Sequence, residues 1–228
     1  MTVLHLADDG ETADLAAFLS RLLHYDRSAA VRLQAAGTAL AVFGRPPSFE
    51  VLAIRAVRLA KPYEDGLDVT LDVTVSAGEL LESVDEPAAT ATVPGAVTGP
   101  PWAGVLPPRG GWQPEPGLPA PQALRATVAA AVSEFRSRTQ ELAPDGRTRA
   151  ELDRIGRDIW SRTVGGTPLP VRAVHAAQSL GFLRPAAATD TADEVVLLSS
   201  GAWLRLRTPY GSIAVRRAGL GALGVSVR

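Results

Sequence analysis

A proline-rich stretch in the middle of the chain, residues 94–121, constrains the fold more than any other feature. It holds nine of the 18 prolines, six glycines, and two of the four tryptophans, Trp102 and Trp112. Proline fixes φ and lacks an amide donor, so neither a helix nor a central strand can pass through the stretch. We therefore predict three parts: an acidic α+β module over 1–94, a connector over 95–120, and a basic helical unit with a C-terminal β-hairpin over 121–228.

The connector is too apolar to be a flexible linker, since linkers of that kind are rich in glycine, serine and polar residues. Burying one indole removes about 150–250 Å² from water. At about 25 cal/mol per Å², this outweighs the roughly 1–2 kcal/mol needed to order the backbone at that residue. We expect Trp102 and Trp112 to be mostly buried and the two halves to be docked together.

The two halves carry opposite charge. Residues 1–94 have seven Lys and Arg against 14 Asp and Glu, whereas residues 121–228 have 15 Arg against nine acids. A basic half predicts an anionic partner such as nucleic acid. Alternatively, the acidic and basic halves of neighbouring molecules meet in a homo-oligomer, or the arginine excess reflects genome composition.

Several catalytic chemistries have no matching pattern in the chain. There is no cysteine, which excludes disulfides and thiolate chemistry. The histidines, His5, His24 and His175, are far apart and lack metal-binding spacing, and no phosphate-binding or serine-hydrolase motif occurs. We assign no catalytic residue, metal or cofactor and expect a binding protein, with an enzyme built from scattered acids as the alternative.

The N-terminus lacks a basic region followed by an apolar run, so no signal peptide is expected. No stretch approaches the roughly 18 apolar residues of a membrane span. These observations predict a cytoplasmic protein without a membrane partner.

Apolar periodicity predicts the elements of the acidic half. Residues 13–24 repeat apolar side chains at helical spacing after a Thr12 cap. Alternating residues predict an antiparallel meander, with Asp72 and Thr74 on a solvent-facing side of its last strand. Ser76 and Glu79 form a capping box for a helix over 77–84. The predicted strands cover residues 2–6, 30–33, 39–43, 49–59 and 67–75.

The basic half reads as three helices followed by strands. Helices are predicted over 121–142, 148–163 and 170–180, with Gly181 as a left-handed cap. Strands follow over 195–198, 202–208 and 212–217. The fold class is therefore α+β, and this order of elements is that of a winged helix-turn-helix.

In a winged-helix interpretation the third helix enters the major groove and the hairpin contacts phosphates. The candidate nucleic-acid-binding residues are then Arg172, His175, Trp203, Arg205, Arg207, Arg216 and Arg217. The alternative is a helical bundle packed on the hairpin with a solvated arginine face, in a protein-interaction module with no nucleic-acid role.

Three fragments carry a resemblance to a known family: PPRGGW at 107–112, LGFL at 180–183 and TPYGSIAVRR at 208–217. They resemble an uncharacterised conserved family of high-GC Gram-positive bacteria. The resemblance implies no activity and no functional residues.

Overall fold

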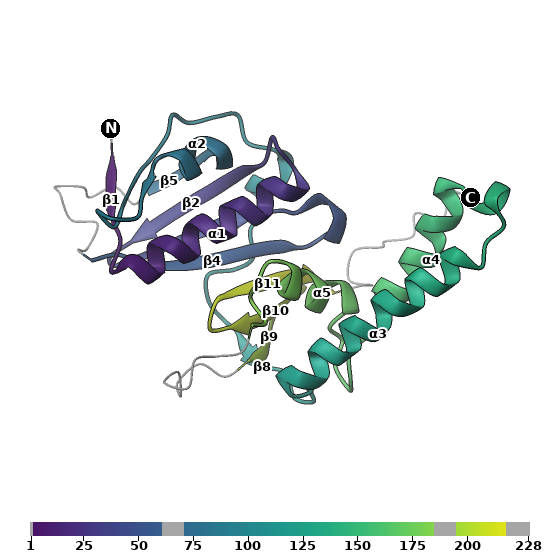
Figure 1. The fold of residues 1–228 in the computed structure, drawn as a ribbon. Coiled ribbons are helices and arrows are strands. Elements are labelled where there is room, and N and C mark those ends of the chain that lie inside the picture. Colours follow the sequence, from purple (N-terminus) through teal and green to yellow (C-terminus); the bar gives the residue numbers. More distant parts are fainter. Residues whose placement is uncertain (1, 61–70, 185–194, 218–228) are drawn as a thin grey trace, which may run out of the picture.

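The computed structural model describes residues 2–60, 71–184 and 195–217, and its class is α+β, as predicted (Figure 1). Its centre is an antiparallel eight-stranded sheet with the order β5-β2-β3-β4-β11-β10-β9-β8. The strands are β2 (Ala30–Ala36), β3 (Ala39–Gly44), β4 (Leu52–Arg58), β5 (Leu71–Ser76), β8 (Gln113–Pro114), β9 (Val196–Ser200), β10 (Trp203–Thr208) and β11 (Gly211–Arg216).

This sheet runs through both halves of the chain. Strand β4 of the acidic half pairs with β11 of the basic half, and Ala53 lies opposite Ile213 in the register. One hydrophobic core, which contains buried residues from both halves, lies between the sheet and the helices. The two halves are therefore docked through backbone pairing as well as through side-chain packing.

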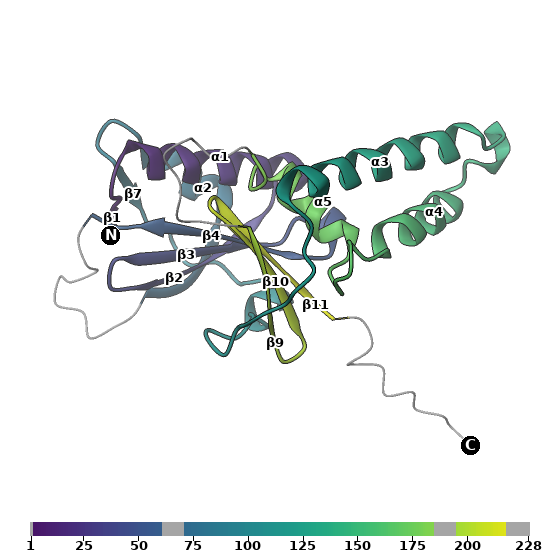
Figure 2. The same ribbon diagram turned by 90° about the horizontal axis from the view of Figure 1, so that it is seen from below.

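The helices lie along one side of the sheet (Figure 2). Of these, α3 and α4 form a pair that extends beyond the sheet (Figure 1). Within the described residues, no helix is long and apolar enough to cross a membrane. The helices are α1 (Asp9–Tyr25), α2 (Ala77–Glu82), α3 (Pro121–Gln140), α4 (Arg149–Ser161) and α5 (Val171–Ser179), with short 3₁₀ turns η1 (Pro47–Phe49), η2 (Pro101–Gly104) and η3 (Pro144–Gly146).

A small second sheet joins the N-terminus to the end of the acidic half. It has the order β1-β7-β6, with β1 (Val3–His5) paired to β7 (Thr90–Thr92) and β7 to β6 (Val84–Asp85). The sequence predicted the first of these strands and missed the other two, which are very short.

The predicted start of α1 is wrong by one turn. Asp8 caps the helix, because its Oδ1 accepts a hydrogen bond from the Glu11 amide at 2.9 Å. Thr12 is instead buried within the helix and donates its hydroxyl to the Asp8 carbonyl. Both residue types cap helices well, so the sequence alone did not separate the two starts.

Three other helix ends agree with prediction. Ser76 and Thr148 accept hydrogen bonds from the amides of Glu79 and Glu151, respectively. Gly181 has φ +77° at the end of α5, and a Cβ there would lie 2.9 Å from the Arg21 guanidinium carbon. Glycine is therefore required there for its backbone conformation and for the close approach of Arg21.

The connector crosses the face of the sheet opposite the helices. Near its start it lies beside β5, where the Val97 amide donates to the Thr74 carbonyl, and toward its end it forms β8 beside β9. Between these points Trp102 packs on a second core of Phe43, Leu52, Ile54 and Ala214. Both connector indoles are half-buried, and Trp112 donates its Nε1–H to the Pro108 carbonyl at 3.0 Å.

The connector also corrects the predicted solvent-facing side of the strand over 67–75, of which residues 67–70 lie outside the described part. Asp72 is exposed as expected, whereas Thr74 is only 6% exposed. A Cβ on Gly99 would lie 3.2 Å from the Thr74 hydroxyl. The connector thus covers part of a face that looked solvated from alternation alone.

Candidate functional site

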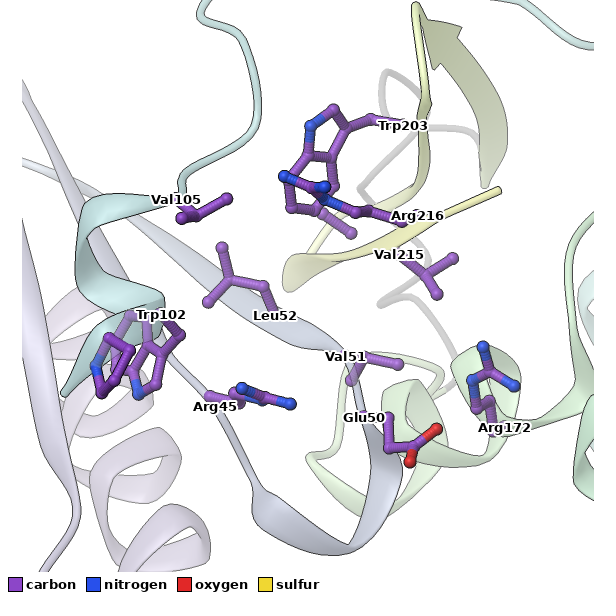
Figure 3. Close-up of a pocket in the computed structure, with 12 residues that line it drawn as sticks. Arg45, Glu50, Val51, Leu52, Trp102, Val105, Arg172, Trp203, Val215 and Arg216 are labelled. Atoms are coloured by element: carbon purple, nitrogen blue, oxygen red, sulfur yellow. The ribbon is translucent and has the colours of Figure 1, made fainter. Parts of the chain in front are cut away.

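A cavity of about 350 Å³ opens where the connector, the η1 turn, α5 and the β10–β11 hairpin meet (Figure 3). Its apolar floor comes from the start of β4 and the end of β11, near the point where the two halves pair. The lining residues are Arg45, Glu50, Val51, Leu52, Pro101, Trp102, Val105, Arg172, Trp203, Ala214, Val215 and Arg216.

Two tryptophans from distant parts of the chain line this cavity. Trp102 is held by η2, whose start is set by Pro100 and Pro101, and it packs on the second core. Trp203 begins β10 directly opposite Arg216 of β11, and the Arg216 guanidinium lies 5.2 Å from its ring centroid. Both indoles are half-buried, so each keeps part of its surface open to a ligand.

Three arginines, Arg45, Arg172 and Arg216, surround the cavity. Among the described residues none of the three forms an ion pair, although arginines elsewhere do, as Arg138 does with Asp158 at 2.6 Å. The buried Nε of Arg172 also has no hydrogen-bond partner there. Arg172 therefore has a buried donor to spare, and Arg45 and Arg216 are exposed, so all three can bind an anionic ligand.

Glu50 stands at the cavity in an uncommon backbone conformation. Its φ of +52° and ψ of +38° lie in the left-handed region, which costs a residue with a Cβ about 1 kcal/mol or more. The neighbours Phe49 and Val51 are 6% and 3% exposed, and their burial holds Glu50 in place. The carboxylate itself is exposed and forms no ion pair with any described residue.

A second cavity of about 700 Å³ adjoins the first. The two share Arg45, Pro101 and Trp102, and the second continues toward Asp26 and Ser76. Trp102 therefore stands between two hollows on the same surface, and a ligand longer than the first cavity has a path past it.

The structure brings together three of the seven predicted site residues, Arg172, Trp203 and Arg216. Arg205 is half-buried, with its guanidinium 5.8 Å from the Trp112 ring, and burial and the charge of Arg207 lower its pKa. Arg207 is exposed on β10.

The other two predicted residues have structural partners. Arg217 forms an ion pair with Glu115 of the connector. The His175 ring stacks on Trp160 with centroids 4.7 Å apart and meets the Phe49 ring at 5.0 Å. Burial lowers the pKa of His175. This histidine is therefore part of an aromatic contact between the two halves.

Sequence reasoning missed Arg45 and Glu50 and treated Trp102 only as an anchor. Arg45 lies next to a Pro-Pro turn, where no periodicity assigns a direction to a side chain. Glu50 was placed in the predicted strand over 49–59, whose start is wrong, because η1 ends at Phe49 and β4 begins at Leu52. The backbone of Glu50 carries no sequence signal, because glutamate is an uncommon choice for a left-handed position.

Comparison with known families divides the chain near η2. Residues 107–220 match a family described as "Domain of unknown function (DUF8185)", and residues 1–104 match one described as "Domain of unknown function (DUF8010)". No curated protein and no solved structure matches significantly. The cavity lies where these two matched regions meet. It takes Trp102 from the region 1–104 and Arg172, Trp203 and Arg216 from the region 107–220.

Proposed function

The chain belongs to the family described as "Domain of unknown function (DUF8185)". For this member of the family we propose that it is a non-catalytic binding protein for single-stranded nucleic acid. One observation carries the proposal: two half-buried tryptophans and three arginines without ion-pair partners among the described residues line the same cavity. Stacking platforms combined with cations are the arrangement that binds single strands.

The chemistry of the lining supports a nucleotide ligand. Arginine binds phosphate through several N–H donors, and the parts of Trp102 and Trp203 that remain exposed suit stacking by a base. The volume of about 350 Å³ lies in the range of small-molecule pockets. Of the described residues that line the cavity, Glu50 is the one carboxylate, so the paired carboxylates of a glycoside hydrolase are missing there.

A single strand suits the surface better than a duplex. The second cavity extends the binding path past Trp102, which favours a chain of nucleotides over a mononucleotide. A winged-helix mode would place α5 in the major groove. However, five of the nine α5 residues are buried, and His175 is stacked on Trp160. The exposed surface of α5 is therefore small for reading base edges.

Fluorescence anisotropy with a labelled thymidine oligonucleotide tests the proposal. At about 50 mM salt we expect binding that weakens as salt rises. Trp102→Ala should weaken it roughly 10-fold, because a stacked base contributes about 1–3 kcal/mol. Arg216→Ala should weaken it and make it less dependent on salt, because a phosphate contact is lost.

The matched control is Arg149→Ala on the distant α4, where the side chain is 91% exposed, and this variant should bind like the wild type. Equal affinity for duplex and single strand, or no binding to any strand at low salt, would overturn the proposal.

A further inference from the structure

We infer that Glu50 selects guanine within the bound strand, an inference that rests on the proposed function. Its basis is the placement of one carboxylate without an ion-pair partner among the described residues, in a cavity otherwise lined by cations, indoles and apolar side chains. A site that binds only phosphate needs no carboxylate, because a carboxylate repels phosphate.

The fold holds Glu50 at this place. Phe49 and Val51 are buried on either side, and the backbone between them takes the left-handed conformation. Strain of this kind persists where the surroundings fix it, and it is found most often at binding sites. In Figure 3, Arg45 extends toward Glu50 from the connector side and Arg172 stands on its other side.

The charge of Glu50 indicates which part of a nucleotide it meets. A carboxylate repels phosphate, so the phosphates of the strand belong at Arg45, Arg172 and Arg216 rather than at Glu50. An ionised carboxylate has two acceptor oxygens and no donor. It therefore suits a base edge that presents hydrogen-bond donors.

Guanine is the base whose edge matches best. Its N1–H and N2–H₂ are adjacent donors, one for each carboxylate oxygen. Adenine and cytosine place a ring acceptor beside their single amino group, and thymine flanks its N3–H with two carbonyls. Each of these bases therefore sets an acceptor against the carboxylate, which disfavours it.

Competition between short strands tests the inference. The probes are thymidine oligonucleotides with one central guanine, hypoxanthine, adenine or cytosine, and a single guanine per strand avoids self-association of guanine-rich sequences. We expect guanine to bind roughly 10-fold more tightly than adenine or cytosine, the discrimination of one bidentate contact. Hypoxanthine lacks the N2 amine and should be intermediate.

Glu50→Gln should abolish this preference, because an amide offers one acceptor and one donor. Glu50→Asn, which tolerates the left-handed backbone well, should do the same and guards against a folding defect in the first variant. The control Glu141→Gln, at an exposed position after α3, should keep the preference.

The outcomes separate the two proposals. Strand binding with equal affinity for all four bases, or a guanine preference that survives both Glu50 variants, overturns the role of Glu50 and leaves the proposed function standing. Absence of binding to every strand overturns both.

Discussion

At the scale of single residues, arginines with different roles are distinguished by their partners. Arg55 is buried under α1, and its side chain is 7% exposed. Its guanidinium binds Glu11 at 2.9 Å, Asp14 at 3.3 Å and the Tyr210 carbonyl at 2.8 Å. The cavity arginines have no such ion pairs among the described residues, so the arginine excess of the chain contains both structural and available cations.

Arg55→Ala should destabilise the fold by about 3–5 kcal/mol, because it leaves partly buried carboxylates without their main partner. Arg58→Ala removes a side chain that is 72% exposed and pairs with the same Glu11, and it should destabilise the fold much less because solvent screens this pair. Denaturant unfolding of the two variants measures both values. A loss below about 1 kcal/mol for Arg55→Ala would contradict the structural role.

His175 makes stability depend on pH. Burial lowers its pKa from the ordinary 6.5, so the unfolded chain binds a proton before the folded one does. Its contribution is complete above pH 6.5 and is lost as pH falls from there toward the lowered pKa.

Unfolding should therefore become easier in an upper pH window, as the pH falls below about 6.5, and His175→Phe, which keeps a ring on Trp160, should lose this slope. Glu134 and Asp158 have pKa values lowered mainly by hydrogen bonds from Arg162 and Arg138, respectively, so their contributions are lost at more acidic pH. An equal slope in wild type and variant over the upper window would refute the assignment to His175.

At the scale of elements, periodicity and capping predicted most helices and strands, whereas their edges depended on contacts. The capping boxes at Ser76 and Thr148 are local and were readable. The pairing of β8 with β9 could not be predicted, because a proline-rich segment has no strand pattern and β8 is a strand only through its hydrogen bonds to β9. Local sequence patterns do not predict short strands that form only by pairing with a strand distant in the sequence.

The turn between β10 and β11 provides a test at this scale. Gly211 has φ +154°, and a Cβ there would lie 2.6 Å from the Phe182 ring that follows α5. Gly211→Ala should lower the free energy of unfolding by about 2–4 kcal/mol through backbone strain and overpacking. Gly37→Ala, at φ +56° with open space, should lose about 1 kcal/mol. Similar losses in the two denaturant curves would show that Phe182 does not constrain the turn.

At the scale of the whole molecule, the sequence indicated two halves with opposite charge but not how they join. The contact between β4 and β11 links residues more than 150 positions apart, and nothing local encodes it. The candidate site likewise combines residues that are distant in the sequence. Trp203, Arg172 and Arg216 were predicted from charge and aromatic residues in the basic half, whereas Arg45, Glu50 and Trp102 join them only through the fold.

The fold also brings opposite charges of the two halves together within one molecule. Asp14 of the acidic half binds Arg184 of the basic half at 2.7 Å, so some of the opposite charge is compensated within one molecule. This reduces the electrostatic reason for the two halves of neighbouring chains to associate. The available cations lie instead around the cavity at the junction.

The central claim is that bases of a single strand stack on the indoles of this cavity, and tryptophan fluorescence tests it most directly. Titration with a thymidine oligonucleotide should quench the wild-type emission. The quenching should be largely lost in a Trp102→Phe, Trp203→Phe double variant and kept in a Trp112→Phe, Trp160→Phe double variant. Quenching that is the same in both double variants, or absent in the wild type, would contradict the account.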